Sequence, residues 1–138
     1  MIYETIYRKL NKLIPNLAEI EDYAKLTAPG FMDLGVDIID RNDDYTVIAL
    51  SHYYKHPSGD MIPDPDMEVR ICHELQMAEA MSYQDTYGYQ QVYHDWDTET
   101  QRFRKVAPRA KKELNSFLNK WLTNLLQQGH AIADKAGV

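Results

Sequence analysis

The sequence predicts an α+β fold: an N-terminal helix, an antiparallel meander of about five strands, and a long C-terminal amphipathic helix packed on one sheet face. Apolar residues recur with helical spacing at both ends of the chain, whereas through the middle they alternate with polar residues. At 138 residues we expect one domain. Its parts are the N-terminal helix and a connection in 1–29, the sheet in 30–97 and the C-terminal helix in 108–129.

The first helix is indicated by an apolar stripe made of Ile2, Ile6, Leu10, Leu13, Ile14 and Leu17. Pro15 ends or bends this helix, because proline disfavours helical backbone in the residue before it. The stretch that follows is expected to be a loose connection with a helical turn around 18–23. Its TAPG ending breaks regular structure before the first strand.

The predicted sheet begins at Phe31, where the period of the apolar pattern changes to two. The RNDD segment 41–44 is expected to be a hairpin turn, since Asn and Asp tolerate left-handed backbone and bond to their own main chain. The second strand has apolar residues on both faces, which favours a central place in the sheet. The later strands are predicted over 45–54, 66–74, 75–84 and 89–96.

The last helix has the clearest pattern in the chain. Its apolar stripe consists of Leu114, Phe117, Leu118, Trp121, Leu122, Leu125 and Leu126. The other face is expected to carry Lys111, Lys112, Asn115, Asn119 and Lys120. Pro108 suits the start of the helix and Gly129 its C-terminal cap. Each large side chain contributes about 1.5–3 kcal/mol when buried, so this helix is the main partner of the sheet.

Charge is distributed unevenly along the chain, whose net charge is −6. Residues 30–100 contain fifteen acidic and three basic residues, which argues against nucleic-acid binding there because phosphate contacts need Lys and Arg. The basic cluster in 102–112 is expected to be a solvated helix start, with nucleic-acid contact as a weaker alternative. A single cysteine, Cys72, fits a cytoplasmic location, and no apolar run approaches the length of a membrane span.

The segment LSHYYKHPSGDMIPDPDMEV, from Leu50 to Val69, has the highest density of potentially reactive side chains. We interpret it first as a structural turn, second as a binding loop over 56–66 and third as a metal site. The metal hypothesis uses His52, Asp60 and Asp64, and with Asp66 it would make a metal-assisted hydrolase. No metalloprotease or calcium-loop template fits this spacing, no catalytic residue is identified and no cofactor is predicted.

Tyrosines accumulate in the predicted sheet and its turns, at positions 45, 53, 54, 83, 87, 89 and 93. Tyr is common at half-buried sheet positions and is also enriched in recognition surfaces. Together with the acidic background, this favours a protein-binding or adaptor module over an enzyme and leaves the question of catalysis open. The candidate binding residues are His52, Tyr53, Tyr54, Asp60, Asp64 and Asp66. A DNA-mimicking inhibitor is a sharper alternative, and the strand edge or aromatic face could make a homodimer.

Four segments resemble a small bacterial family of unknown function found in plasmids, integrative elements and prophages: MDLGVDII, YTVIALSHYYKHPSGDMIPDPDM, YQDTYGYQQVY and FLNKWLTNLLQQG. The layout is more loosely similar to the YqiB-like proteins. The resemblance covers about residues 30–130 and implies accessory cargo of a mobile element. It also implies a distinctive residue set, for which no catalytic role can be carried over: His52, Tyr53, Gly59, Asp60, Asp64, Pro65 and Met67.

Overall fold

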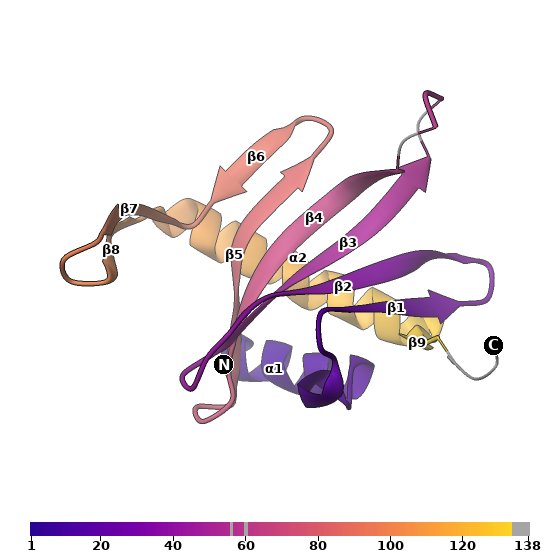
Figure 1. Cartoon of the computed structure of the whole chain (residues 1–138), viewed down its shortest axis with the longest axis horizontal. Helices are drawn as coiled ribbons and strands as arrows, with labels where there is room; N and C mark the ends of the chain where they lie inside the picture. Colours follow the sequence, from indigo (N-terminus) through magenta and orange to yellow (C-terminus); the bar gives the residue numbers. More distant parts are fainter. Residues whose placement is uncertain (56, 60, 134–138) are drawn as a thin grey trace.

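The computed structural model describes residues 1–55, 57–59 and 61–133, without the side chains of residues 54, 55 and 61–63. Within these residues the chain forms two α-helices, one 3₁₀ turn and nine strands (Figure 1). Their order is α1 (Ile2–Leu13), η1 (Leu17–Glu19), β1 (Tyr23–Ala28), β2 (Phe31–Arg41), β3 (Thr46–Lys55), β4 (Met61–Cys72), β5 (Met77–Asp85), β6 (Gly88–Gln91), β7 (Tyr93–Asp97), β8 (Arg102–Val106), α2 (Pro108–Gln128) and β9 (Ala131–Ile132). The predicted α+β class is confirmed.

Seven of the described strands form one antiparallel sheet in the order β6-β5-β4-β3-β2-β1-β9. The strands from β1 to β6 follow one another as a meander, while β9 returns from the end of the chain to pair with β1. The strands β7 and β8 form a separate two-stranded hairpin. The meander predicted from the alternating pattern is therefore the central part of a wider sheet.

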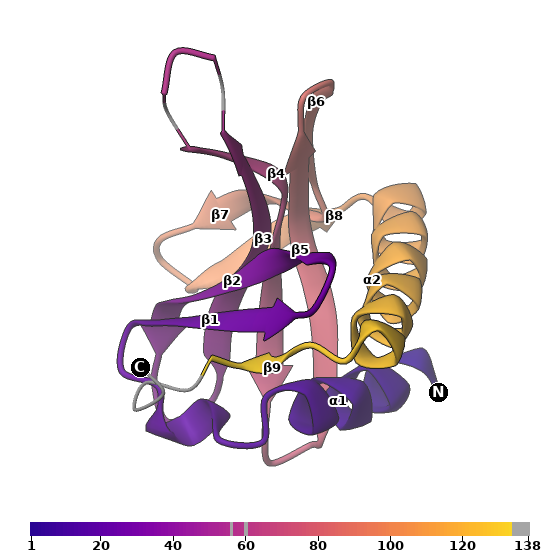
Figure 2. The same cartoon turned by 90° about the vertical axis from the view of Figure 1, so that its right-hand side faces the viewer.

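Both helices pack on the same face of the sheet, as the two views of the chain show (Figures 1 and 2). The Lys9 ammonium of α1 joins the two helices by donating to Asn119 Oδ1 at 2.7 Å and to Thr123 Oγ1 at 2.8 Å. Side chains of the sheet that point toward the helices form the core with the helix stripes, among them Leu26, Leu34, Val36, Ile48, Leu50, Met67, Val69 and Ile71. No α-helix of the described residues covers the opposite face.

The ends of α2 agree with the sequence prediction. The helix starts at Pro108, and Gly129 caps it in the left-handed conformation with φ 86°. One prediction for this helix was wrong, because Asn115 is buried instead of solvated. Its side-chain oxygen accepts a hydrogen bond from the backbone amide of Ala80 at 2.8 Å. Ala80 lies next to a register shift between β4 and β5, where the regular backbone hydrogen bonds are interrupted, so Asn115 gives this amide a partner.

The structure also contains a strand, β1, where the sequence was expected to form a loose connection. In β1 the residues Ala24, Leu26 and Ala28 point inward and are buried, whereas Tyr23 and Lys25, which alternate with them, are exposed. The alternation is present in the sequence, but two of its three inward positions are alanines, which give a weak apolar signal. The expected helical turn around 18–23 is confined to η1.

The later strands differ in their boundaries from the prediction. The segment 89–96 is divided at Val92, whose amide donates to the carbonyl of Met81 at 2.9 Å and ends the pairing of β6. The strand β8 occupies the start of the basic segment that was expected to begin a helix. The strand β4 begins at Met61, so part of the predicted 56–66 loop is strand, while His56 and Asp60 lie outside the described residues.

Register shifts occur in four neighbouring pairings, β1–β2, β2–β3, β3–β4 and β4–β5. An extra residue in one strand of a pair bends that strand and increases the local twist. Repeated shifts therefore curve the sheet around the two helices. In the part of the chain that the structure describes, no helix is long and apolar enough to cross a membrane.

The substitution Leu118→Ala tests the packing of α2. Leu118 is fully buried (0% exposed), so its truncation should lower the free energy of unfolding by about 2–5 kcal/mol through lost apolar contact and a residual cavity. Urea denaturation measures the difference. The matched control is Lys120→Ala, two residues away on the exposed side of α2, which should change stability by less than about 0.5 kcal/mol. Equal effects of the two substitutions would contradict this packing.

Candidate functional site

The open face is defined here as the side of the sheet opposite α1 and α2, and its centre carries Tyr23, Asp37, Tyr53, Asp66 and Glu68. The strand register brings these residues together from four strands. Tyr23 pairs with Asp37, Asp37 with Ala49, and Ala49 with Glu68, so one row crosses β1 to β4. Directly paired residues of antiparallel strands point to the same face.

A second row runs beside the first and contributes Gly35, Ser51 and Asp66. Ser51 is 1% exposed, and its hydroxyl donates to Asp66 Oδ1 at 2.8 Å. This bond fixes the carboxylate of Asp66 next to that of Glu68, on the same side of β4. The floor of the open face between the acidic groups is thus made of small side chains.

The ring of Tyr53 packs against Gly35. A Cβ atom at Gly35 would be 2.9 Å from Tyr53 Cε2, which is closer than such carbon atoms approach, and a tight 3.3 Å from Tyr23 Oη. From this position the hydroxyl of Tyr53 reaches Asp37 and donates to its Oδ2 at 3.5 Å. The absence of a side chain at Gly35 is therefore what lets the two tyrosines sit beside the carboxylates.

Two carboxyl groups of the open face, those of Asp37 and Glu68, have raised pKa values. Burial raises the pKa of Asp37, and the charges of Asp66 and Asp22 raise it further, while the Tyr53 hydrogen bond offsets part of this. Burial and the charge of Asp66 also raise the pKa of Glu68. No ion pair joins Asp37, Asp66 or Glu68 to a residue within the described ranges. A cation placed here would relieve repulsion that the protein itself leaves in place.

The pKa values of the two tyrosines of the open face, Tyr23 and Tyr53, are also raised. Burial raises the pKa of Tyr53, and so does the neighbouring charge of Asp37. The pKa of Tyr23 is raised by burial and by the charges of Asp37 and Asp33. Both phenols consequently remain neutral hydrogen-bonding groups at physiological pH.

A hollow of about 580 Å³ adjoins this cluster at the β1–β2 end of the open face. Phe31 and Met32 line it and are each 50% exposed, and Tyr23 is 45% exposed. Large apolar side chains exposed together are more informative than single exposed ones, because such patches commonly mark contact surfaces. The hollow is completed by Lys25, Asp33, Gly35 and Tyr53.

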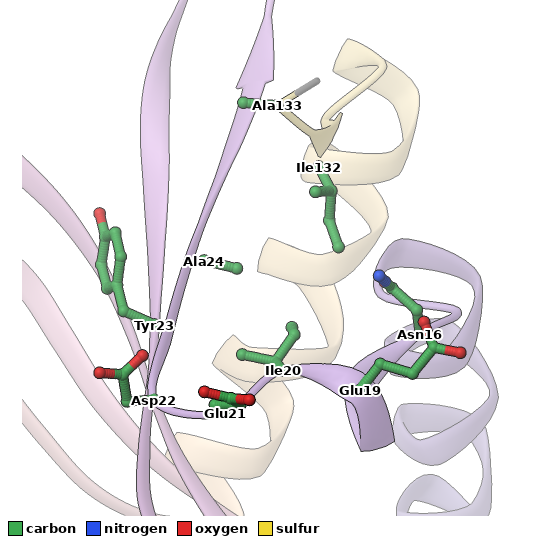
Figure 3. A pocket seen from close by; sticks show the side chains of 9 residues that line it. All are labelled: Asn16, Glu19, Ile20, Glu21, Asp22, Tyr23, Ala24, Ile132 and Ala133. Atoms are coloured by element: carbon green, nitrogen blue, oxygen red, sulfur yellow. The ribbon is translucent and has the colours of Figure 1, made fainter. Parts of the chain in front are cut away.

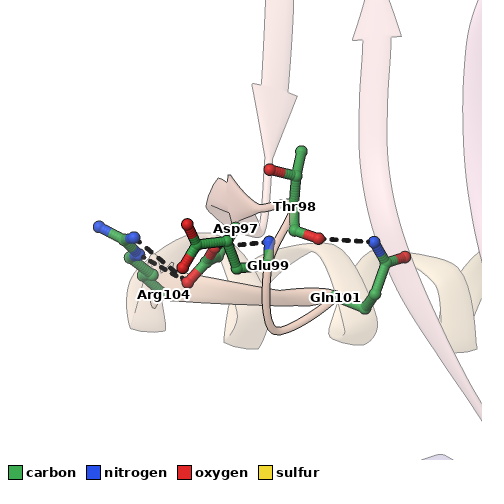
Figure 4. Close-up of polar contacts among 5 residues, drawn as sticks. All are labelled: Asp97, Thr98, Glu99, Gln101 and Arg104. Carbon is green, nitrogen blue, oxygen red and sulfur yellow. Dashed lines mark hydrogen bonds and ion pairs between the residues drawn. The ribbon is translucent and has the colours of Figure 1, made fainter.

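The hairpin of β7 and β8 borders a second hollow, of about 510 Å³, at the other end of the open face. The hairpin is held by aromatic contacts, with Trp96 and Phe103 rings 4.9 Å apart. In its turn, Asp97 accepts hydrogen bonds from the Glu99 amide at 2.9 Å and from Arg104 at 3.2 Å (Figure 4). Arg70, on the floor, pairs with Glu79 and lies 5.6 Å from the centre of the Tyr93 ring.

His52 lies on the helix side of the sheet, away from the open face. Its Nδ1 is 2.8 Å from the carbonyl oxygen of Asp33, and its Nε2 is 3.3 Å from Trp121 Nε1. A carbonyl can only accept and an indole N–H can only donate, so the neutral ring with its proton on Nδ1 satisfies both contacts. The ring of His52 is thereby used in joining β3, β2 and α2.

The other candidate residues from the sequence are placed as follows. Tyr53 and Asp66 lie on the open face, and Asp64 lies at the end of the sheet, where it accepts a hydrogen bond from Thr86. Tyr54 belongs to β3, but its side chain is outside the described part, and Asp60 is not described. Since His52 and Asp66 point to opposite faces of the sheet, they cannot hold the same ion. Among the described residues, no group of three His, Cys, Asp or Glu side chains is arranged to bind a metal.

Sequence reasoning missed three members of the open face: Tyr23, Asp37 and Glu68. The signal for Asp37 was present, because it is a polar residue of the alternating stretch MDLGVDII and must point away from the core. Glu68 follows from the same alternation around the buried residues Met67 and Val69. Only the register of neighbouring strands places them beside Asp66.

Comparison with protein families identifies one match, which spans residues 2–131 of the chain. The matching family is described as Domain of unknown function (DUF6908). The chain belongs to the DUF6908 family. Comparison with curated proteins and with solved structures gives no match. This DUF6908 domain thus has an α+β fold in which one face of the antiparallel sheet is open.

Substituting Gly35 by Ala should displace Tyr53, because the new methyl group would overlap with the ring. The expected loss in the free energy of unfolding is about 1–3 kcal/mol, measured by urea denaturation. Gly88→Ala is the matched control, since a Cβ at Gly88 meets nothing within 4 Å. In a double-mutant cycle, Tyr53→Ala should remove most of the penalty of Gly35→Ala. Strictly additive effects would show that the ring does not cover Gly35.

The raised pKa values of Asp37 and Glu68 have a consequence for stability. Both groups bind protons more readily in the folded than in the unfolded chain, so they favour folding at low pH and this contribution is lost as pH rises. Lowering the pH from 7 to 5 should therefore raise the stability contributed by these two sites. In Asp37→Asn/Glu68→Gln the melting temperature should be higher than wild type at pH 7 and the gain on acidification smaller.

Thermal melts at several pH values measure this effect. Asp97 acts in the opposite direction, because its hydrogen bonds lower its pKa and its contribution is lost only at more acidic pH. The comparison is consequently confined to pH 5–7. If the double variant has the same pH dependence of the melting temperature as the wild type, the pKa values of Asp37 and Glu68 are not raised in the folded protein.

Proposed function

We propose that this DUF6908 protein is a protein-binding module whose open face binds a basic segment of a partner. The observation that carries the proposal is the set of carboxylates at Asp37, Asp66 and Glu68, which face one way, repel one another and form no ion pair with any described residue. A Lys or Arg side chain of a partner would offset this repulsion. Such charge complementarity increases both specificity and the rate of association.

The surroundings of the acidic cluster also support binding to a protein. Tyr23 and Tyr53 present rings with hydroxyl groups beside the carboxylates, and Phe31 and Met32 expose apolar surface next to them. Tyrosine, methionine and other large side chains of this kind are enriched in interfaces, where a buried apolar centre is surrounded by polar groups. The proposed partner segment therefore combines a basic residue with an adjacent apolar side chain.

The test is affinity purification of the tagged full chain from its own host, after nuclease treatment at moderate salt. The wild type should retain a stoichiometric protein partner that Asp37→Asn/Asp66→Asn/Glu68→Gln loses. This triple variant keeps a hydrogen-bond acceptor at all three positions, so its melting temperature should be no lower than that of the wild type. Raising the salt concentration should weaken capture by the wild type, because the attraction is electrostatic.

The matched control changes the net charge by the same amount elsewhere. Asp43, Asp44 and Asp95 are exposed and lie in turns or on the hairpin, so the triple Asn variant at these positions should keep the partner. Loss of the partner in both triple variants would indicate a general charge effect. Retention in both, or no partner on the wild type, would contradict the proposal.

A further inference from the structure

The hairpin cleft, defined here as the hollow between the β7–β8 hairpin and the sheet, is lined by four aromatic side chains. Its volume of about 510 Å³ is in the size range of protein ligand sites. Its aromatic residues are Tyr45, which directly precedes β3, Tyr93 and Trp96 of β7, and Phe103 of β8. Trp96 stays 47% exposed although its ring packs against that of Phe103 with centres 4.9 Å apart. The cleft thus presents aromatic surface to an incoming group.

The hairpin that forms the outer wall of this cleft is attached to the sheet at two points. The hydroxyl of Tyr93 donates to Glu79 of β5 at 2.9 Å, and the amide of Ala107 donates to the carbonyl of Val92 at 2.7 Å. A wall that is already in place loses little conformational freedom when the cleft is filled. The described lining contains no residue of β9, which lies at the opposite end of the molecule from the hairpin (Figure 1).

The charged residues of the hairpin cleft balance one another, in contrast to the acidic centre of the open face. Two arginines, Arg70 and Arg102, line it together with two carboxylates, those of Asp40 and Glu68. Arg70 is 31% exposed, so part of its side chain remains open to a ligand. Guanidinium groups stack on aromatic rings, whereas they repel other cations. The cleft is therefore better suited to an uncharged ring than to a second basic side chain.

The hairpin cleft is continuous with the acidic centre of the open face, because Glu68 belongs to both. Along β4, Glu68 and Arg70 stand two residues apart on the same side of the strand. Two residues of extended chain span about 6.5–7 Å, and side chains two positions apart point the same way. An extended partner segment with a basic residue over Glu68 thus places the side chain two positions away at the cleft.

The cavity between η1, β1 and β9 has different surroundings, although its volume, about 580 Å³, is similar (Figure 3). Three carboxylates line it, those of Glu19, Glu21 and Asp22, and Tyr23 is the only aromatic residue of its described lining. The combination of several rings with an exposed guanidinium therefore distinguishes the hairpin cleft from this cavity.

We propose that the partner segment carries an aromatic residue two positions from its basic residue, and that this aromatic ring enters the hairpin cleft. There it contacts the ring of Trp96 and the guanidinium of Arg70, while the basic side chain meets the carboxylates at the centre of the open face. The inference rests on the function proposed above and adds a second determinant of the partner. Aromatic side chains held in preformed pockets commonly contribute a large part of the binding energy at interfaces.

The test titrates the full chain with peptides that have blocked termini, measured by calorimetry. The reference peptide is Gly-Phe-Ser-Arg-Ser-Phe-Gly, whose two rings allow either direction of binding. Its isomer Gly-Ser-Phe-Arg-Phe-Ser-Gly has the same composition, but its rings are adjacent to the arginine and point to the other side of an extended chain. The reference peptide should bind at least about tenfold more tightly than the isomer.

The position of the ring is followed by NMR through the two indole N–H signals of the protein, which the variant Trp96→Phe assigns. The signal of Trp96 should shift on saturation with the reference peptide, because an aromatic ring changes the magnetic field at its neighbours. Trp121 is the internal control, since its indole donates to His52 on the helix side of the sheet at 3.3 Å and its signal should stay in place.

The variant Trp96→Ala should bind the reference peptide at least about tenfold more weakly than the wild type. Tyr87→Ala is the matched control, because Tyr87 is 96% exposed in the turn between β5 and β6 and lines no part of the cleft. Thermal melting checks the folding of both variants. The comparison of the two isomeric peptides uses the wild type alone, so it decides the proposal even if Trp96→Ala does not fold.

Equal binding of the two isomers, an unshifted Trp96 signal at saturation, or no binding of either peptide would overturn the inference. A third peptide, Gly-Phe-Ser-Gln-Ser-Phe-Gly, separates it from the function proposed above. Loss of binding with glutamine, together with equal binding of the two arginine isomers, would retain the basic determinant and overturn the aromatic one. Binding as tight as that of the reference peptide, with the shift at Trp96 preserved, would support the aromatic determinant and contradict the basic one.

Discussion

The packing of two helices on one face of the sheet is the constraint on which the other features depend. Because α1 and α2 both cover the same side, the alternating residues of β1 to β5 face either the core or the open side of the sheet. The Lys9 bonds to α2 and the Asn115 bond to Ala80 fix the two helices relative to each other and to the sheet. The chemistry of the open face is then determined by the alternate residues of four strands.

The open face and the β1 edge share one residue, Tyr23, through different groups. Its ring contributes to the aromatic and acidic cluster, while its main chain faces the edge. The side chain and the main chain of Tyr23 thus have different surroundings, because a strand residue projects its ring out of the sheet and its backbone groups within the plane of the sheet.

The fold could be predicted from the sequence further than the site could. The stripe of α2, with Pro108 and Gly129 at its ends, determines a helix without reference to the rest of the chain. Predicting the residues of the open face requires the register between neighbouring strands, and this register depends on bulges that cannot be recognised in the sequence. Residues 64 and 65, for example, both stand opposite His52, so the alternation of β4 changes at that point. His52, prominent in the sequence, has its ring nitrogens bonded within the fold, and Asp37 gains its importance from neighbours on other strands.

The hairpin of β7 and β8 is closed at its base, because the amide of Ala107 donates to the carbonyl of Val92 at 2.7 Å. Val92 is buried and Ala107 directly precedes α2, so this bond holds the end of the sheet beside the start of the helix. Within the intervening segment 93–106, Tyr93 remains attached to the sheet, because its hydroxyl donates to Glu79 of β5 at 2.9 Å. The turn between β7 and β8 lies beyond this closure, so its length can change without displacing α2, and it is a suitable position for grafting a foreign loop.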